Sequence, residues 1–244
     1  MVEFESAITK ITHFPIEEGH SARVFECSIP AGVSFSFVSG QFAMVAHPDV
    51  KLLANPSVLK WASYSISSSP AQRGVLEFCI GDGSPTGVSH KLMSLSVGDK
   101  ILVKGPFGKF NLNESAPEYV FLATGTGIAP LISMIRTLVT SGKKIPISLY
   151  FGFRFPSQFM YADELALLQQ SYPHFKCIPI VSRPDEKWKH KKGHIQDVLK
   201  DYSSPLKQKA LVYICGKPQV AEELAAFCIE SMRFPSEHVL LEKW

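Results

Sequence analysis

Two patterns of apolar and polar positions follow one another along this chain. Over the first 110 residues, short β-rich runs recur between residues that favour turns. One segment among them, Gly87–Leu95, has the pattern of a helix. Several short strands with little helix predict a barrel or a sandwich. The expected strands are Ala7–Phe14, Ala22–Ile29, Gln41–Val45, Ser63–Ser67, Val75–Ile80 and Lys100–Val103.

The pattern changes after Asn113–Pro117, where strand-like runs begin to alternate with helical ones. That alternation is typical of βαβ units around a parallel sheet. We therefore expect two domains, residues 1–113 and 117–244, with a boundary near Glu114–Pro117. The expected strands are Tyr119–Ala123, Ile147–Phe151, Cys177–Val181 and Leu211–Cys215, and the expected helices are Leu131–Val139, Asp163–Gln170, Ile195–Lys200 and Val220–Met232.

This organisation predicts where ligands bind. In an open parallel sheet, a ligand lies beyond the carboxyl ends of the strands, at the point where the strand order reverses. A barrel docked beside that edge makes a cleft between the domains. We therefore expect a site for two ligands.

Composition narrows the class of protein. A chain of 244 residues suits two domains, and its apolar and charged fractions are those of a globular protein. No apolar run reaches the roughly 20 residues needed to span a bilayer. The beginning of the chain, MVEFESAITK, is acidic where a secretory signal is basic and apolar, so we expect a cytoplasmic protein.

Cysteine spacing and net charge bear on further classes of protein. The five cysteines are far apart and none has CxxC spacing, so we expect neither a metal site nor an iron–sulfur centre held by clustered cysteines. The formal charge of +3 is too small to indicate nucleic acid binding. A local basic face could still attract an acidic protein.

A glycine-rich turn follows the first expected strand of the second domain. In LATGTGIAP (Leu122–Pro130), the segment Gly125, Thr126 and Gly127 comes directly after a strand and opens a helix. Glycines there let the backbone approach a pyrophosphate, whose charge is favoured by the amides at a helix start. A purely structural turn is the alternative, and the position after a strand at the domain boundary favours the phosphate site.

Six motifs in order carry a resemblance to a known family. They are ASYSISSSP (Ala62–Pro70), VKGPFGKF (Val103–Phe110), LATGTGIAP, YFGFRFPSQFMYADEL (Tyr150–Leu165), YICGKPQVAEEL (Tyr213–Leu224) and LLEKW at the end of the chain. Together they resemble the ferredoxin–NADP reductase superfamily over nearly the whole chain. The resemblance implies a six-stranded antiparallel flavin-binding β-barrel followed by a nicotinamide-binding α/β domain with a parallel sheet.

The resemblance assigns residues to the flavin. It implies that the Tyr64 ring covers one face of the isoalloxazine and that the Ser65 hydroxyl lies near flavin N5. An ordinary strand, with Tyr64 packed and Ser65 in solvent, is the alternative. The implied flavin contacts continue through the strand and into GSPTGVSHKL, which is similar to the family's second phosphate-contact turn. They are Ile66, Ser67, Ile80, Gly87, Val88 and Ser89.

One position departs from the family. An arginine usually stands two residues before this tyrosine and neutralises the flavin pyrophosphate, whereas this chain has Ala62. Lys60 is near, but a lysine does not reproduce a bidentate guanidinium. This departure leaves FMN open, and the turn at Gly87–Ser89 favours FAD.

The resemblance also assigns the point of hydride transfer. It implies that Ser65, Cys215 and Glu242 surround that point, with Gly216 beside the cysteine and Trp244 on the second face of the flavin. The alternatives are a buried strand-end thiol for Cys215 and a frayed tail for Trp244. The protein is expected to supply alignment, while the flavin carries the redox chemistry.

The third strand of the second domain ends in residues that suit NADPH. By resemblance, Ser182 and Arg183 grip the 2′-phosphate, and Lys192 and Gln196 match later phosphate contacts, with His194 where a tyrosine usually stands. Arginine suits a phosphate dianion in shape and charge. Arg183-Pro184 and the tryptophan-containing stretch after it also resemble NADH-type reductases, so NADP(H) is favoured and NAD(H) stays open.

Arg154, in the FGFR turn, is a second candidate for the dinucleotide. Its alternative role is a surface ion pair with Asp163 or Glu164.

The leading functional hypothesis is an NADPH-dependent flavoprotein reductase of a separate acidic carrier, ferredoxin or flavodoxin. Reduction of free flavin or another diffusible acceptor is one alternative. The reductase component of a multicomponent oxygenase is another, although no clustered cysteines for a fused iron–sulfur centre are present. A non-catalytic dinucleotide-binding regulatory module is the alternative outside the enzymes, and only Ala62 supports it.

Overall fold

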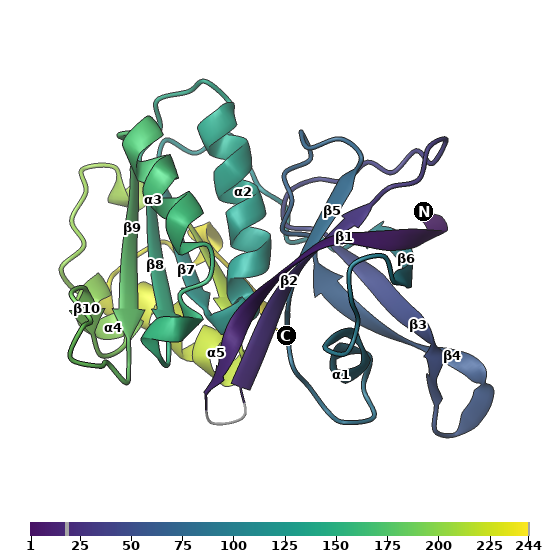
Figure 1. Cartoon of the computed structure of the whole chain (residues 1–244). Helices are drawn as coiled ribbons and strands as arrows, with labels where there is room; N and C mark the ends of the chain where they lie inside the picture. The colour runs from purple at the N-terminus through teal and green to yellow at the C-terminus, as the bar shows by residue number, and fades with distance from the viewer. Residues whose placement is uncertain (18–19, 244) are drawn as a thin grey trace. The chain divides into compact units, whose positions relative to one another are not determined.

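The computed structural model describes residues 1–17 and 20–243 (Figure 1). The chain divides into two compact units. Met1–Leu112 and Ile132–Met134 belong to the first, and Asn113–Leu131 and the chain from Ile135 onward belong to the second. No helix in the described residues is long and apolar enough to cross a membrane.

The first unit is built around a six-stranded antiparallel sheet in the order β4-β3-β6-β1-β2-β5. An isolated bridge between Ile66 and Phe78 joins the two edge strands, and the amide of Ser67 donates to the carbonyl of Glu77 at 2.8 Å. The sheet therefore closes into the predicted β-barrel. Its strands are β1 (Val2–Glu17), β2 (His20–Ser28), β3 (Phe42–Leu52), β4 (Asn55–Ser65), β5 (Val75–Gly81) and β6 (Lys100–Phe107).

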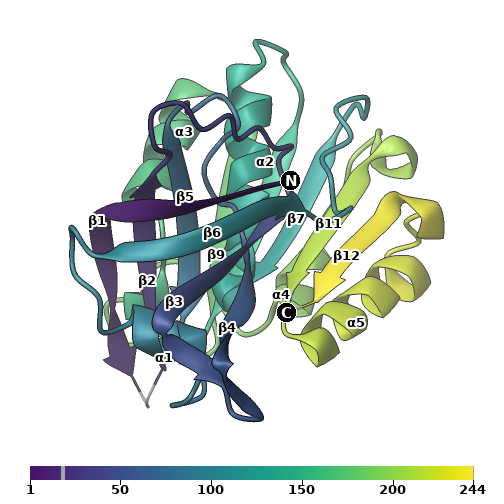
Figure 2. The same ribbon diagram turned by 90° about the vertical axis from the view of Figure 1, so that its right-hand side faces the viewer.

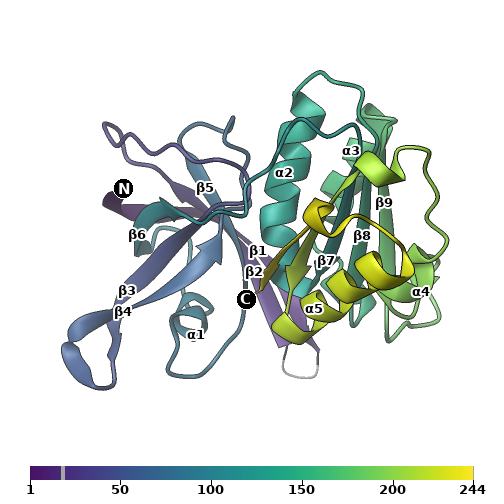
Figure 3. The same cartoon turned by 180° about the vertical axis from the view of Figure 1, so that it is seen from behind.

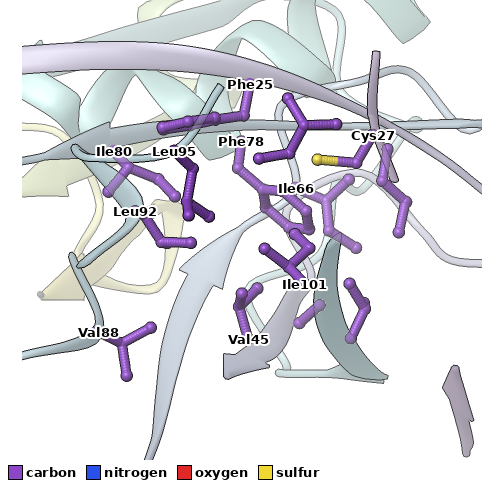
Figure 4. Close-up of a cluster of buried hydrophobic side chains, with 14 of the residues drawn as sticks. Phe25, Cys27, Val45, Ile66, Phe78, Ile80, Val88, Leu92, Leu95 and Ile101 are labelled. Atoms are coloured by element: carbon purple, nitrogen blue, oxygen red, sulfur yellow. The ribbon is translucent and has the colours of Figure 1, made fainter. Parts of the chain in front are cut away.

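Alternation along the strands fills the barrel with apolar side chains (Figure 4). Phe25, Ile66 and Phe78 have at most 1% of their surface exposed. The short helix α1 (Val88–Leu92) adds Val88 and Leu92 to the same cluster. Figure 2 shows α1 beside the ribbon of β3 and β4, whose long hairpin extends past the helix.

The second unit contains a six-stranded, entirely parallel sheet in the order β10-β9-β8-β7-β11-β12. The predicted combination of an antiparallel barrel and a parallel α/β domain is therefore confirmed. The strands are β7 (Tyr119–Thr124), β8 (Ile147–Phe153), β9 (Phe175–Val181), β10 (Lys191–Lys192), β11 (Leu211–Gly216) and β12 (Val239–Lys243).

Helices cover both faces of this sheet. Figures 1 and 3 show α2 (Ile128–Thr140) and α3 (Ala162–Ser171) on one face, and α4 (Ile195–Leu199) and α5 (Pro218–Ala226) on the other. Val120, Leu122 and Ile214 pack with Leu199 and Leu224 in the core beneath α4 and α5. Parallel strands covered by helices have nearly continuous apolar sequences, because both of their faces are buried. Strands β7 and β11 have such sequences.

The elements differ from the sequence prediction in several places. The α-helix expected over 220–232 ends at Ala226 and continues as a π-helical turn, Phe227–Ser231. Helix α2 begins at Ile128 rather than Leu131, and Pro130 is tolerated because the first-turn amides have no acceptor within the helix. Strand β12 was not predicted. Short 3₁₀ turns lie at Gly125–Gly127, Pro156–Gln158, Lys207–Lys209 and Ser236–His238.

Candidate functional site

The strand order of the parallel sheet reverses between β7 and β11. From β7 the chain proceeds to β8 and β9 on one side of it, and then crosses to β11 and β12 on the other side. A ligand of an open parallel sheet binds at such a point, beyond the carboxyl ends of the strands. The predicted turn Gly125–Gly127 directly follows β7, and Gly216 ends β11. The structure therefore places both glycine segments at the switch point.

At two of these positions, Gly127 and Gly216, neighbouring atoms come too close to leave space for a side chain. A Cβ atom added at Gly127 would overlap the carbonyl group of Cys215 and lie 2.9 Å from the Cα of Gly216. A Cβ atom added at Gly216 would overlap the hydroxyl of Thr124 and lie 3.3 Å from its Cβ. The backbone of the turn after β7 thus packs on the end of β11, and the end of β11 packs on the side chain of Thr124. The role of Thr124 was missed from the sequence, because threonine is common in strands.

Gly125 serves another purpose. Its φ of +54° is in the left-handed region that favours glycine, and a Cβ atom there would meet nothing within 4 Å. The next element, helix α2, has no side-chain cap at its N-terminus. The amide of Ile128, the first residue of α2, donates to the carbonyls of Gly125 and Thr126 within this turn. The bare glycine backbone would let a pyrophosphate come close to the helix start. These residues fit a dinucleotide.

Cys215 and Glu242 are neighbours across strands β11 and β12, in direct register. The Cys215 side chain is 1% exposed. Burial raises the pKa of its thiol well above the ordinary value, and the negative charge of Glu242 raises it further. The thiol therefore stays protonated at neutral pH, as a neutral hydrogen-bonding group rather than a nucleophile.

Arg154 and Arg183 lie side by side at the carboxyl ends of β8 and β9. The amide of Ser182 donates to Phe153 at 3.0 Å, and that of Arg183 to the Arg154 carbonyl at 2.8 Å, so pairing continues past the strands. The Arg183 guanidinium lies 5.7 Å from the centre of the Phe155 ring. Both arginine side chains and Ser182 are exposed. The edge thus presents two exposed cations.

One of the two carboxylates considered as partners of Arg154 is engaged by another arginine. Glu164 binds Arg136 through two hydrogen bonds of 2.6 and 2.7 Å. This bidentate pair links α2 to α3 and engages both oxygens of the carboxylate. The backbone amide of Arg154 donates to Gln158 at 3.2 Å, which fixes the turn after β8.

Lys192 lies beyond β9, whereas Gln196 belongs to a helix that packs against β8. Lys192 is exposed on β10, in register with Val181, and Gln196 is in the first turn of α4. His194 precedes that helix as its N-cap residue, and its amide donates to Asp197 at 2.8 Å. A histidine therefore stands at the start of α4 where the family's tyrosine was expected.

An aromatic cluster that was not predicted from the sequence anchors the loop between β9 and β10. The indole of Trp188 donates to the carbonyl of Lys191 at 2.9 Å, and its ring meets Phe153 edge-on at 5.5 Å. Phe159 stacks on Phe153 at 5.2 Å. These contacts hold the loop beside the end of β8. Only the unusual tryptophan in a polar segment could have signalled them.

In the first unit, Tyr64 is bound to Ser89. The two hydroxyl oxygens are 2.8 Å apart, and this bond joins β4 to helix α1. Burial raises the pKa of the Tyr64 hydroxyl to about 12, so it is a neutral phenol at physiological pH. Ser65 is half-buried and pairs with Phe42 of β3. The structure therefore brings together Tyr64 and Ser89, two residues that the sequence assigned separately to the flavin.

Four other expected flavin contacts have their side chains in or beside the barrel core. Ile66, Ile80 and Val88 are at most 2% exposed and belong to the apolar cluster. Ser67 is fully buried, and its hydroxyl donates to Glu77 at 2.8 Å. These side chains build the barrel, so a cofactor contact at these positions would involve main-chain atoms.

The turn before α1 is tight. The amide of Gly87 donates to the Ser84 carbonyl at 2.7 Å, and a Cβ atom at Gly87 would lie 2.9 Å from that oxygen. The ammonium of Lys60 donates to the Thr86 carbonyl at 3.1 Å. Strand β4 is thereby joined to this turn as well as to Ser89.

The other expectations concern metals and the last residue. Among the described residues, no group of three or more His, Cys, Asp or Glu side chains could hold a metal ion. The five cysteines are free thiols, and four of them are buried. Trp244, expected against the flavin, lies outside the described residues.

Comparison with family models identifies both units. The model for oxidoreductase FAD-binding domains matches residues 15–112, and the one for oxidoreductase NAD-binding domains matches residues 121–225. The chain therefore has an FAD-binding domain and a domain for a nicotinamide dinucleotide. The preference for FAD over FMN agrees with the first match.

Two curated relatives illustrate the sequence similarity. One component of the Na(+)-translocating NADH-quinone reductase of Marinomonas sp. is 30% identical over 197 residues, which cover 74% of this chain and 48% of the relative. The anthranilate 1,2-dioxygenase electron transfer component of Acinetobacter baylyi is 26% identical over 210 residues, covering 85% and 58%. The chain thus spans about half the length of these relatives.

Solved structures share the fold. A ferredoxin NADP+ reductase from Neisseria gonorrhoeae with bound FAD and NADP has a TM-score of 0.81 at 20% identity, over 99% of this chain and 98% of the other. The cytochrome b5 reductase domain of Ulva prolifera nitrate reductase gives 0.79 at 18%, over 99% and 97%. With the two domain matches, this confirms the resemblance: the chain belongs to the ferredoxin–NADP reductase superfamily of flavin- and NAD(P)-binding oxidoreductases.

Proposed function

We propose that this protein is a flavoprotein reductase that takes hydride from NADPH in preference to NADH and passes the electrons to a separate acceptor. The observation that carries the proposal is the carboxyl edge of the parallel sheet. There the glycine-lined end of β7 is followed by Arg154 at the end of β8, the next strand, and by Arg183 at the end of β9, two strands along. The glycines suit the pyrophosphate of a dinucleotide, and the arginines suit an additional phosphate.

The protein's part in the reaction is to hold and align its ligands. When bound, FAD supplies the two-electron chemistry and can release electrons singly. Tyr64 would cover the flavin as a neutral phenol, and Ser65 would bind near N5. Cys215 would offer a protonated thiol to the nicotinamide, with Glu242 as its charged neighbour across β11 and β12. Alignment of donor and acceptor atoms at contact distance lowers the barrier by several kcal/mol.

For the acceptor, the proposal is an acidic one-electron carrier, ferredoxin or flavodoxin. The net charge of +3 and a sequence pI of about 8.5 support an acidic partner through electrostatic steering.

A second candidate acceptor is the oxygenase of a multicomponent system. It is favoured by the names of relatives: the anthranilate 1,2-dioxygenase electron transfer component, the phenol hydroxylase P5 protein and the propane 2-monooxygenase reductase component. Free flavin or another diffusible acceptor is the third. These candidates share the same nicotinamide half-reaction and differ only in what receives the electrons.

One experiment tests both parts of the proposal. The purified protein, reconstituted with FAD, is mixed anaerobically with NADPH or NADH in a stopped-flow instrument, and the bleaching of flavin absorbance is followed. The reduced protein is then mixed with ferredoxin, flavodoxin, a purified oxygenase component or free FMN. Faster bleaching by NADPH supports the nicotinamide assignment, and faster bleaching by NADH contradicts it. A protein that binds neither FAD nor FMN would instead be a regulatory module.

A further inference from the structure

The chain passes from β3 to β5 directly after Tyr64 and Ser65. Ser65 is the last residue of β4 and pairs with Phe42 of β3. The next residue, Ile66, forms a bridge with Phe78 of β5, and both side chains lie in the barrel core (Figure 4). The direction of the Ser65 side chain therefore depends on how the chain is held on the β5 side, from Ile66 onward.

The segment that follows is held by Glu77 of β5. The carbonyl of Glu77 accepts a hydrogen bond from the amide of Ser67 at 2.8 Å. Its carboxylate accepts another from the Ser67 hydroxyl, also at 2.8 Å. Its amide donates a third to the hydroxyl of Ser68 at 3.1 Å. The backbone and the side chain of Glu77 are thus both bound to two consecutive residues.

These hydrogen bonds are shielded from water. Ser67 and Ser68 are fully buried, and Glu77 is 8% exposed. A hydrogen bond from a hydroxyl to a carboxylate is charge-assisted, and in a buried place little water competes for either partner. Loss of an acceptor for a buried hydroxyl is costly. The chain at Ser67 therefore has little freedom to shift along β5.

A second carboxylate lies next to Glu77 but is bound in another way. Glu26 of β2 is directly opposite Glu77 in the pairing of β2 with β5. The Glu26 side chain is 31% exposed, and it forms an ion pair with Lys10 at 2.7 Å. The two acidic residues share a place in the sheet, and only Glu77 binds the segment after Ser65 in this way. Glu26 is therefore a suitable control for Glu77.

We propose that Glu77 is a positioning residue for the flavin ring: by binding Ser67 and Ser68, it fixes the chain directly after Tyr64 and Ser65. Successive side chains of a strand point to opposite faces, so a slip of one residue in this segment would turn Ser65 away. Glu77 acts through the two serines and not by contact with the flavin. This inference rests on the proposed function only through flavin binding at Tyr64 and Ser65.

The test measures the affinity of the apoprotein for FAD and for riboflavin, by quenching of flavin fluorescence. Glu77→Leu keeps a side chain of similar size and removes the acceptor, so both affinities should fall by about tenfold to a hundredfold. The two losses should be equal, because riboflavin has the same ring as FAD but no phosphate. The visible circular dichroism of the bound flavin should change as well.

A conservative variant separates the hydrogen bond from the charge. Glu77→Gln keeps an acceptor oxygen for the Ser67 hydroxyl, so its FAD affinity should stay within about threefold of the wild type and its visible circular dichroism should be unchanged. An equal loss in the Gln and Leu variants would overturn the assignment. If Glu77→Leu does not fold, Ser67→Ala removes the same hydrogen bond from its other end and should weaken the binding of both flavins by about tenfold.

A role in stability alone would give a different result. Glu77→Leu would then unfold at a lower urea concentration, while the folded protein would bind FAD with the affinity and circular dichroism of the wild type. That outcome would overturn the proposal, and so would a loss of affinity for FAD but not for riboflavin.

Glu26→Leu is the matched control, because it removes the neighbouring carboxylate without touching Ser67 or Ser68. Its affinity for FAD should equal that of the wild type, and a loss as large as that of Glu77→Leu would contradict the assignment. A wild-type protein that binds no flavin would overturn the proposed function itself. Wild-type flavin binding in a folded Glu77→Leu protein would overturn only the role of Glu77.

Discussion

Arg183 is oriented by its own backbone and by an aromatic ring. Its amide is bonded to the carbonyl of Arg154, and its guanidinium lies over the ring of Phe155. A guanidinium over an aromatic face has a defined plane, and its fork of N–H groups matches the geometry of a phosphate. This orientation supports the proposal that Arg183 binds a phosphate at the end of β9.

From this arrangement we expect Arg183→Ala to lower kcat/KM for NADPH by about tenfold to a hundredfold, with little effect on NADH. A charge-assisted hydrogen bond is worth about 1.5–3 kcal/mol, and only NADPH carries the 2′-phosphate that would make it. Steady-state kinetics with both nucleotides measure the effect. Arg73→Ala, an exposed arginine of the first unit, is the control and should change neither value. Equal losses for the two nucleotides would remove the phosphate assignment.

The reactivity of Cys215 depends mainly on burial of its thiol, whereas Arg183 is oriented by its contacts. Its pKa is raised first by burial and second by the charge of Glu242. A thiol with a raised pKa forms its reactive thiolate only at high pH. The expectation is that iodoacetamide leaves Cys215 unmodified at pH 8, as judged by mass spectrometry of tryptic peptides.

Replacing Glu242 by a neutral residue tests the direction in which its charge shifts the pKa of Cys215. Glu242→Gln should lower the pKa of Cys215 and increase its alkylation at alkaline pH, while burial still keeps that pKa above the ordinary value. Lys243→Gln, which removes the adjacent ion pair with Glu222, is the comparison and should leave alkylation low. Rapid modification of Cys215 in the wild type at pH 8 would contradict the burial argument.

For single residues, candidate roles could be assigned from the sequence, but the hydrogen bonds that the side chains make could not. Tyr64 and Ser89 are identified by motifs 25 residues apart, yet nothing in either motif indicates that their hydroxyls meet. Ile66 and Ile80 were assigned to the flavin, and the structure places their side chains in the barrel core. An alternating strand presents its residues to both faces, and sequence alone does not say which face a motif residue occupies.

Among the elements, the turn between β7 and α2 has the strictest packing. The atoms that a Cβ at Gly127 would meet are backbone atoms of Cys215 and Gly216, which cannot move aside as a flexible side chain would. Such overpacking costs about 1–3 kcal/mol, and it would also push apart the strand ends at which we propose that the dinucleotide binds.

We therefore expect Gly127→Ala to lower the free energy of unfolding by about 1–3 kcal/mol in urea titrations and to weaken nicotinamide binding. Gly142→Ala is a matched control. Gly142 has a φ of +74° just after α2, and a Cβ there would meet nothing within 4 Å. Its substitution should cost about 1 kcal/mol of stability through backbone strain alone and leave nicotinamide affinity intact. A fully stable Gly127→Ala protein would refute the packing argument.

The elements that could be predicted are those with a strong local period. Long apolar runs such as Tyr119–Ala123 stood out, because strands buried on both faces are continuous in sequence. Strand β12 did not, since Val239–Lys243 is short and partly exposed and is stabilised by pairing with β11, a partner distant in sequence. The π-helical turn at Phe227–Ser231 was also missed, because its apolar residues continue the helical pattern of α5.

For the whole molecule, the sequence predicts the two classes of architecture and not the order of the strands. The change from β-rich runs to alternating strands and helices depends on neighbouring residues, so it can be recognised in the sequence. The order β10-β9-β8-β7-β11-β12 depends on pairings between distant segments, and only that order shows where the sheet reverses. The position of the candidate site could therefore be anticipated from the glycine motif, but its geometry required the structure.

The net charge of the whole chain leads to a last prediction, which concerns the acceptor. A protein of net charge +3 attracts an acidic carrier by a long-range field that salt screens over about 10 Å at 0.1 M. The rate constant for reduction of ferredoxin or flavodoxin should therefore fall several-fold as salt rises from about 0.05 to 0.5 M. An uncharged quinone, which the field does not steer, should be reduced at a nearly constant rate over the same range. Stopped-flow mixing of the pre-reduced protein with each acceptor makes the comparison independent of nicotinamide binding. If the carrier and the quinone respond alike to salt, charge does not guide the acceptor, and a diffusible acceptor becomes the better assignment.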